Sequence, residues 1–387
     1  MKRGTLLKAL VPCFLLLVAG SGLPAEPPER ALDPLSPRDG NVRLVVFNPE
    51  VSNIKALAAL REHGILDIPN LVVVGIHHAK QAGDFPASRK YVVEKQLAWF
   101  RFHVVSGEIR EPEVFQTNAC TPEFEVIVKQ ADGVIFFGGP DIPPSVFGRK
   151  THLLTGIEDP YRHYLELSAI FHLLGGFQND RFTPLLQARP GFPVLGICLG
   201  FQSLNVGTGG TLIQDIWAAS YKKTYVEDAI ALGPERWHSN PYRRLFPLDK
   251  VMSCNFHTIR LDAQGLFCSV MGFASSDHPR VLSSHHQAAD RIGKDLVAVA
   301  TSRDGKIVEA VGHRKFPGVL GVQFHPEHPM LWDTEPRVRQ KPGDPLTSCH
   351  AILKGTPPSL EFHKTVWKWF AERLVGSHGQ HADKGTP

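Results

Sequence analysis

The sequence has little cysteine, no concentrated charge and no long apolar run in its main part. Its six cysteines among 387 residues are too few for a disulfide scaffold. The formal net charge is only +4 and no basic run exceeds two residues, so nothing in the composition suggests nucleic acid as a partner. The apolar run from Ala9 to Gly20 is shorter than the roughly 20 residues that a membrane span needs. We therefore expect a globular protein without stable membrane insertion.

The first 25 residues have the pattern of a secretory signal peptide. Lys2, Arg3 and Lys8 precede the apolar run, small residues follow it, and a segment rich in Pro and Glu comes next. We expect a signal peptide at 1–25, a linker at 26–41 and export to a periplasmic or extracellular location. Pro12 before Cys13 is not a small residue, which argues against a lipoprotein.

Short apolar runs that alternate with helical patterns predict the fold. Buried strands are expected at 42–47, 71–76, 102–105, 133–137 and 193–197. Helical patterns lie between them, which predicts a mostly parallel sheet with helices on both faces. Further strands, separated by turns, are expected at 281–282, 296–300, 307–310 and 319–324. The expected fold class is α/β, with a central mostly parallel sheet flanked by helices and extended by antiparallel strands.

We expect one domain, residues 42–375, that contains three excursions and ends in an amphipathic helix. The excursions lie near 175–190, 217–249 and 329–358. The last of them is rich in Pro, Gly and charged residues. Residues 376–387 are expected to form a disordered tail.

The string Gly196-Ile197-Cys198-Leu199-Gly200 has the form of a nucleophile elbow. It stands between a predicted buried strand and a helical segment, where small neighbours permit a sharp turn that exposes the central side chain. The positive end of the following helix favours a thiolate. We therefore predict Cys198 as the nucleophile and the backbone N–H of Leu199 as an oxyanion donor.

A second string, Gly321 to Glu327, ends a predicted strand with His325 and places Glu327 two residues later. Residues two apart in extended chain face the same side. Glu327 can then hydrogen-bond one imidazole nitrogen of His325 and leave the other facing a thiol, as a base oriented by a third group requires. The sequence thus predicts a catalytic triad of Cys198, His325 and Glu327.

With these motifs the chain resembles the class I glutamine amidotransferase-like cysteine hydrolases, the peptidase C26 type, and among them γ-glutamyl-γ-aminobutyrate hydrolase. The resemblance runs from about Arg43 to Leu331. Four further strings carry it, in the family's order: Gly138-Gly139-Pro140-Asp141-Ile142-Pro143-Pro144; Asp159-Pro160-Tyr161-Arg162 with Glu166; Leu204 to Leu212 with Gln214-Asp215; and Ser284-His285-His286-Gln287-Ala288.

The resemblance implies a flavodoxin-like three-layer fold and hydrolysis of γ-glutamyl amides of small molecules or peptides through a thioester on Cys198. It adds the N–H of Gly139 to that of Leu199 as oxyanion donor and needs no metal or cofactor. Leu199 stands where γ-glutamyl-γ-aminobutyrate hydrolases commonly have Arg, so the amine leaving group stays open.

Six residues are expected at the substrate: Gly138, Asp141, Tyr161, Gln202, His286 and Gln287. For His286 and Gln287 the alternative is simple packing, and for Asp141 and Tyr161 it is a loop cap and a packed ring. Adjacent histidines such as His285 and His286 project to opposite sides of a strand, which argues against a catalytic metal.

Two other functions stay open from the sequence. One is the glutaminase subunit of an amidotransferase, which would need a synthase partner to use the ammonia. The other is a catalytically silent binding protein on the same scaffold. A homodimer is left open as well.

Overall fold

A computed structural model of the chain describes residues 31–32 and 40–383, without the side chains of 381–383. The predicted signal peptide and most of the predicted linker lie outside these residues. The strands are β1 (Val42–Phe47), β2 (Leu71–His78), β3 (Phe100–Val105), β4 (Gly133–Phe136), β5 (Val194–Ile197), β6 (Leu212–Ile213), β7 (Asn255–Leu261), β8 (Arg280–Ser283), β9 (Ala288–Ala289), β10 (Leu296–Ser302), β11 (Val308–His313) and β12 (Val319–Val322).

Helices connect these strands and close the chain. The α-helices are α1 (Val51–Glu62), α2 (Phe85–Glu94), α3 (Thr121–Gln130), α4 (Pro160–Leu174), α5 (Leu199–Gly207), α6 (Ile216–Ala219), α7 (Val226–Ala231), α8 (Tyr242–Leu245), α9 (Leu266–Ser269), α10 (Cys349–Lys354) and α11 (Ser359–Asp383). The 3₁₀ turns are η1 (Glu111–Glu113), η2 (Pro144–Phe147), η3 (Leu185–Ala188), η4 (Pro234–Arg236) and η5 (Pro329–Leu331).

Ten strands form one sheet in the order β3-β2-β1-β4-β5-β12-β11-β10-β7-β8. The strands from β3 to β12 pair in parallel, whereas β11, β10, β7 and β8 are added antiparallel. The predicted fold class, a mostly parallel sheet with added antiparallel strands, is therefore confirmed. The sequence patterns missed β7, in which Asn255, His257, Thr258 and Arg260 interrupt the apolar residues.

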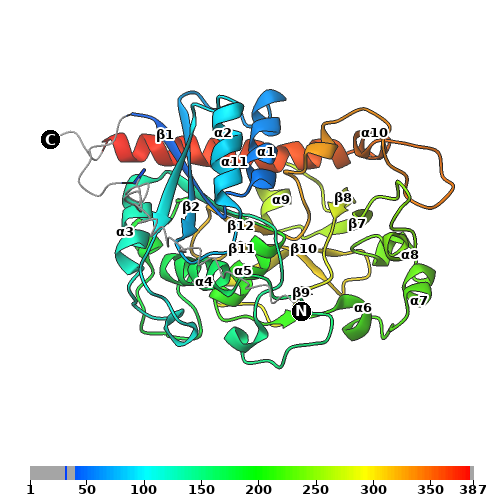
Figure 1. The fold of residues 1–387 in the computed structure, drawn as a ribbon, viewed down its shortest axis with the longest axis horizontal. Helices are drawn as coiled ribbons and strands as arrows, with labels where there is room; N and C mark the ends of the chain where they lie inside the picture. Colours follow the sequence, from blue (N-terminus) through cyan, green and yellow to red (C-terminus); the bar gives the residue numbers. More distant parts are fainter. Residues whose placement is uncertain (1–30, 33–39, 384–387) are drawn as a thin grey trace, which may run out of the picture.

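Helices cover both faces of the parallel part of the sheet (Figure 1). Strand β1 shows the division: Leu44 and Val46 pack in the core that α1 and α11 share, whereas Val45 and Phe47 pack in the core on the side of α3 and α4. Successive side chains of a strand point to opposite faces. A strand buried on both sides must therefore be mostly apolar, and in β1 Arg43 alone interrupts the apolar residues.

The C-terminal helix α11 crosses one face of the sheet (Figure 1) and continues to Asp383. It extends beyond residue 375, where the sequence predicts a disordered tail. Contacts near its end explain the difference: Arg189 donates to Ser377 Oγ at 2.8 Å, and His378 Nδ1 lies 3.0 Å from Asp132 Oδ2. Residues 384–387 of the predicted tail lie outside the described part.

Two of the predicted excursions meet each other beside the sheet. The second, 217–249, contains α6, α7, η4 and α8, and the third, 329–358, contains η5 and α10. Val251, just after the second excursion, bridges to Arg339 in the third. The backbone N–H of Met252 donates to the carbonyl of Arg339 at 3.0 Å, and the N–H of Arg339 donates to the carbonyl of Lys250 at 3.1 Å. Together these segments form a wall.

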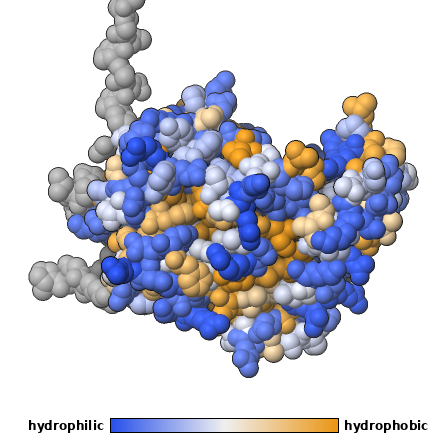
Figure 2. All heavy atoms as spheres, turned by 90° about the horizontal axis from the view of Figure 1, so that it is seen from below, coloured by the Kyte–Doolittle hydropathy of each residue, from blue (hydrophilic) through white to orange (hydrophobic). Residues whose placement is uncertain are grey.

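The surface is mostly hydrophilic, with apolar side chains showing across the middle of the face seen from below (Figure 2). Among the described residues, no helix combines the length and the apolar character that crossing a membrane requires.

Candidate active site

Three neighbouring strands place the predicted catalytic groups side by side. Strand β5 pairs in parallel with β4 on one side and with β12 on the other. Gly138 and Gly139 follow β4, Cys198 follows β5, and His325 lies three residues after β12. Because carboxyl ends of parallel strands share one edge of a sheet, residues far apart in sequence meet there.

Cys198 occupies a strained corner between β5 and α5. Its backbone has φ 52° and ψ −103°, a left-handed conformation that costs a non-glycine residue about 1–3 kcal/mol. Its N–H donates to the carbonyl of Val322 at 2.8 Å, which ties the corner to β12. A Cβ on Gly200 would lie 2.0 Å from the carbonyl oxygen of Phe136, and one on Gly196 would lie 2.6 Å from that of Gly200. The elbow therefore needs both glycines, as the sequence predicts.

His325 and Cys198 both lie close to Gly138. A Cβ built on Gly138 would lie 3.1 Å from Cε1 of His325 and 3.5 Å from Cβ of Cys198. Both residues also line one cavity. The backbone N–H of His325 donates to the carbonyl of Leu282 in β8 at 2.9 Å, so the antiparallel strands help to position the ring.

Glu327 orients the imidazole as predicted: its Oε1 lies 2.7 Å from Nδ1 of His325. Burial lowers the pKa of His325, but the negative charges of Glu327 and Cys198 outweigh burial and hold that pKa well above its usual value. Burial raises the pKa of Glu327, but the charge of His325 and the hydrogen bond to it leave that pKa below its usual value. The pair therefore consists of an imidazolium and a carboxylate at neutral pH.

Arg162 fixes the Gly138–Gly139 peptide, which the sequence reasoning did not foresee. This buried side chain on α4 donates to the carbonyls of Phe137 and Gly138 at 3.2 and 2.9 Å. The Gly138 carbonyl and the Gly139 N–H belong to one trans peptide and point in opposite directions. The N–H of Gly139 therefore points away from Arg162, the orientation that an oxyanion donor beside Cys198 requires.

Arg162 is itself held by a buried ion pair. Its Nε donates to Oε1 of Glu166 at 2.9 Å, with both side chains 4% exposed or less. The signal for this role was present in the sequence as the string Asp159-Pro160-Tyr161-Arg162 with Glu166, but its target, a pair of carbonyls after β4, depends on tertiary structure.

A cavity of about 790 Å³ opens over Cys198 and His325. The wall formed by the second and third excursions lines most of it. Its lining residues from those segments and their borders are Arg243, Asp249, Lys250, Val251, Met252, Ser253, Cys254, His328, Met330, Pro336, Arg337 and Val338. No sequence pattern predicts this wall, because nothing in an irregular segment shows which strand end it will cover.

The predicted substrate residues divide into two groups. Gly138 borders Cys198 and His325, whereas Asp141, Tyr161, Gln202, His286 and Gln287 are absent from the lining of this cavity. Nε2 of His286 lies 3.0 Å from both oxygens of Asp141, so these two residues bind each other. The ring of Tyr161 stacks on His78.

Gln202 and Gln287 lie in the interior beside the site. Gln202 donates to the carbonyl of Gln287 at 3.4 Å and to Oε1 of Gln323 at 3.3 Å. Gln287 is 1% exposed, and its side-chain amide makes no hydrogen bond with another described residue. Substrate contact by any of these residues stays a prediction.

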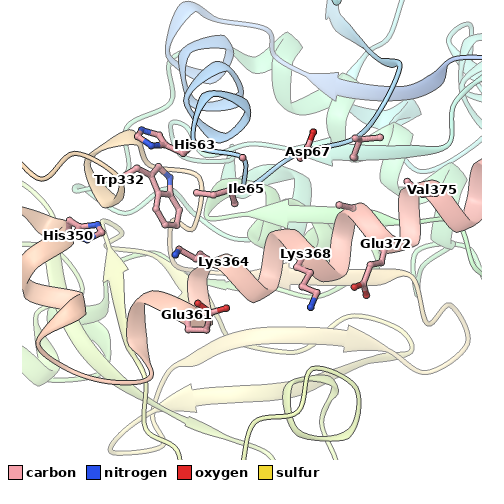
Figure 3. Close-up of a pocket in the computed structure, with 13 residues that line it drawn as sticks. His63, Ile65, Asp67, Trp332, His350, Glu361, Lys364, Lys368, Glu372 and Val375 are labelled. Carbon is pink, nitrogen blue, oxygen red and sulfur yellow. The ribbon is translucent and has the colours of Figure 1, made fainter.

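A second cavity, of about 730 Å³, lies between the end of α1 and helix α11 (Figure 3). It shares no lining residue with the cavity over Cys198. Lys364, Lys368, Glu361 and Glu372 of α11 face it, together with Trp332. No cysteine lines it, so it offers no nucleophile of the kind found at the elbow.

Comparisons with known proteins show which family this sequence is similar to. The model of the family described as Peptidase C26 matches residues 73–327. The glutamine amidotransferase-like protein YvdE of Lactococcus lactis is 30% identical over 204 residues, which cover 53% of this chain and 68% of that protein. Gamma-glutamyl-gamma-aminobutyrate hydrolase PuuD of Escherichia coli is 28% identical over 207 residues, which cover 52% of this chain and 66% of that protein.

Proposed function

The chain belongs to the peptidase C26 family, and we propose that it is a cysteine hydrolase that cleaves γ-glutamyl amide bonds of small molecules or peptides. The family resemblance read from the sequence is thereby confirmed. One observation carries the proposal: Cys198, His325 and Glu327 converge at neighbouring strand ends under a single cavity. The printed name of the relative PuuD, a γ-glutamyl-γ-aminobutyrate hydrolase, supports the bond type.

In the first proposed step, the thiolate of Cys198 adds to the side-chain amide carbon of the γ-glutamyl group. The N–H groups of Gly139 and Leu199 donate to the oxyanion that forms. The carbon–nitrogen bond then breaks, and the departing amine takes a proton from the imidazolium of His325. The products are the free amine and a γ-glutamyl thioester on Cys198.

In the second proposed step, water hydrolyses the thioester. The now neutral imidazole of His325 accepts a proton from water, which adds to the thioester carbon. The carbon–sulfur bond breaks, the acid leaves, and the thiolate and imidazolium are restored. Glu327 remains ionised throughout and stabilises the imidazolium.

The cavity wall supports a substrate that carries carboxylates. Arg243, Lys250 and Arg337 contribute three cationic side chains to it, against one acidic side chain, Asp249. A γ-glutamyl group has an α-carboxylate of its own, and amino acid leaving groups add another. We infer that these cations attract the substrate and help to orient it.

A glutaminase that hands ammonia to a synthase is the second candidate. Leu199 after the nucleophile and the printed name of the relative YvdE favour it. Its substrate would be glutamine, and its activity would depend on a partner. A silent binding protein would show no turnover of any γ-glutamyl amide.

We also propose that the protein is exported and that its substrate is a small molecule or peptide. Export rests on the basic and apolar residues of segment 1–25, and homodimerisation stays a prediction.

The test is amine release from glutamine, γ-glutamyl-γ-aminobutyrate, glutathione and poly-γ-glutamate. The wild type should hydrolyse at least one of them, Cys198→Ala should hydrolyse none, and Cys268→Ala, which removes a thiol outside the cavity, should match the wild type. Hydrolysis of glutamine alone, stimulated by a copurifying synthase, would favour the glutaminase. Equal turnover by Cys198→Ala and the wild type would refute the proposal.

A further inference from the structure

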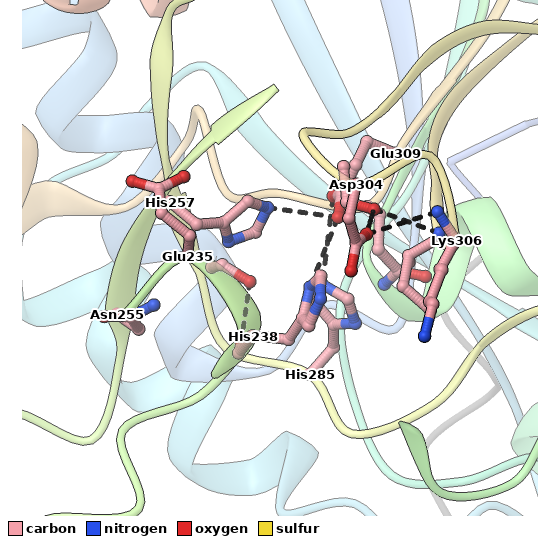
Figure 4. A network of polar contacts seen from close by, with 12 residues as sticks. Glu235, His238, Asn255, His257, His285, Asp304, Lys306 and Glu309 are labelled. Atoms are coloured by element: carbon pink, nitrogen blue, oxygen red, sulfur yellow. Dashed lines mark hydrogen bonds and ion pairs between the residues drawn. The ribbon is translucent and has the colours of Figure 1, made fainter. Parts of the chain in front are cut away.

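A cluster of three histidines surrounds one buried glutamate in the antiparallel half of the sheet (Figure 4). Glu309 lies on β11 and His257 on β7, while His238 belongs to the second excursion and His285 follows β8. The side chains of Glu309, His238 and His257 are fully buried, and that of His285 is 1% exposed. None of the four lines the cavity over Cys198, so the proposed hydrolysis leaves the cluster unused.

The hydrogen bonds of His285 determine which of its nitrogens carries a proton. Its Nδ1 lies 2.8 Å from the carbonyl oxygen of Gln287. A carbonyl can only accept, so Nδ1 carries the hydrogen, and in the neutral ring Nε2 has a lone pair. That Nε2 atom makes no hydrogen bond with another described residue and lies 3.9 Å from Oε2 of Glu309. This pattern, with Nδ1 donating to a carbonyl, is typical of a histidine that ligates a metal through Nε2.

His238 and Glu309 have unused polar atoms at the same place. Neither ring nitrogen of His238 makes a hydrogen bond within the described residues, and neither does Oε2 of Glu309. Nδ1 of His238 lies 3.3 Å from Oε1 of Glu309. Buried polar atoms without partners are costly, about 1–3 kcal/mol each. A lone pair and a carboxylate oxygen that face each other also repel unless a cation or a proton lies between them.

The spacing of these atoms suits a metal ion. One ligand atom each from His238, His285 and Glu309 can be chosen so that all three lie within 4.8 Å of one another. Around zinc, with bonds of about 2.0–2.2 Å, tetrahedral ligand atoms lie roughly 3.4 Å apart. The gap of 3.3 Å from Nδ1 of His238 to Oε1 of Glu309 and that of 3.9 Å from Nε2 of His285 to Oε2 bracket that value. Small side-chain adjustments would therefore bring the ligands to bonding distance.

We propose that His238, His285 and Glu309 bind a divalent transition-metal ion of the zinc type. His257, whose Nε2 lies 3.0 Å from Oε1 of Glu309, donates to the ligating carboxylate and orients it. Imidazole and carboxylate ligands suit zinc. The proposal differs from the sequence-based expectation of no metal, which considered a catalytic ion. The ion proposed here has a structural role and does not touch the substrate.

The position of the site indicates that the ion holds the cavity wall in place. His238 belongs to the excursion that supplies Arg243 and Asp249 to the cavity wall, and His285 directly follows Ser284, which also lines the cavity. The backbone N–H of His285 already donates to the carbonyl of His238 at 3.0 Å. A metal bound by both side chains would fasten this excursion to β11 and so hold the wall over Cys198.

The experiment measures zinc in purified protein and zinc binding after treatment with a chelator. We expect about one zinc ion per chain for the wild type and for Cys198→Ala, and a loss of affinity of about 100-fold or more in Glu309→Gln and His285→Gln. The control is His163→Gln: His163 is fully buried with both ring nitrogens unpartnered within the described residues, but it lies on α4, outside the cluster. It should bind zinc as the wild type does.

Thermal unfolding provides a second measurement, which can also be made on variants of lowered stability. Zinc should raise the melting temperature of the chelator-treated wild type and of His163→Gln, because a ligand that binds the folded state stabilises it. It should not raise that of Glu309→Gln or His285→Gln. A wild type that takes up no zinc would overturn the proposal. So would stoichiometric zinc in both ligand variants, or its loss in Cys198→Ala, which would place the ion at the elbow instead.

Discussion

Oε1 of Glu327 lies 2.7 Å from Nδ1 of His325, two residues earlier in the turn that follows β12. Pro326, between them, accepts a hydrogen bond from the indole of Trp367 on α11 at 2.9 Å. The C-terminal helix therefore holds the turn that brings carboxylate and imidazole together. This contact fixes the orientation of the ring and leaves Nε2 for the reaction at Cys198.

Replacing Glu327 by Gln should lower kcat by about 100- to 10,000-fold, because the imidazolium loses its carboxylate and its fixed orientation. Glu327 helps to keep the pKa of His325 raised. In the variant this pKa should fall, so the activity that depends on the protonated imidazole should be lost at a lower pH than in the wild type. The pH profile of kcat for amine release checks this, and an unchanged alkaline limb would contradict it.

Replacing Arg162 by Met should lower kcat more than it changes KM, because the Gly138–Gly139 peptide loses the donor that orients it. Loss of one oxyanion donor costs about 100- to 1,000-fold in kcat. The single variant should also lose about 3–5 kcal/mol of stability, since Glu166 is left buried without its partner.

The double variant Arg162→Met with Glu166→Met separates the two effects. Replacing both members of a buried ion pair by apolar residues is often close to neutral. Stability measured by denaturant unfolding should therefore recover while kcat stays low. Recovery of kcat together with stability would show that Arg162 acts on the fold alone.

The ion pairs of His286 make stability depend on pH. Burial lowers the pKa of His286, but hydrogen bonds to Asp141 and Asp215 and the charges of both outweigh it and raise the pKa to about 9, from a usual value of 6.5. A raised pKa means that the folded state binds the extra proton. The stabilisation is complete below about pH 6.5 and is lost as pH rises through about 9.

We therefore expect the wild type to lose on the order of 1–3 kcal/mol of unfolding free energy between pH 6.5 and 9.5 relative to His286→Gln. Denaturant unfolding of both proteins across this range measures the difference. Parallel curves for the two proteins would contradict the assignment.

Lys250→Ala and Arg337→Ala should raise KM for γ-glutamyl amides whose leaving groups carry a carboxylate. An exposed charge contributes about 0.2–1 kcal/mol, so we expect a rise of up to about five-fold for each, with little change in kcat and less effect at high salt. Lys364→Ala, in the other cavity (Figure 3), is the control and should leave KM unchanged. Equal effects on charged and neutral leaving groups would argue against recognition of a carboxylate.

The sheet and the elbow were predictable because their signals are local. Buried strands such as β1 are mostly apolar, with Arg43 the one exception in β1, and the turn at Cys198 needs glycines that the sequence contains. The meeting of Cys198 with His325 could be expected as well, because both follow strands of a mostly parallel sheet, and the carboxyl ends of parallel strands lie at one edge.

The rest depends on contacts between distant segments. Strand β7 was missed because its polar residues, among them His257, are buried against residues from distant parts of the chain. No local sequence pattern reveals such partners. The wall over Cys198 comes from two irregular excursions that pair through Val251 and Arg339. The binding of His286 to Asp141 joins residues 145 positions apart, and sequence alone left open whether either would face the substrate.

The most direct test is the mass of the protein during turnover. Wild type mixed with a γ-glutamyl amide and quenched in acid within the first turnovers should carry a γ-glutamyl adduct, and peptide mapping should place it on Cys198 as a thioester that hydroxylamine removes. Cys198→Ala should carry none. An adduct on another residue, or amine release by a wild type that never forms one, would contradict the account.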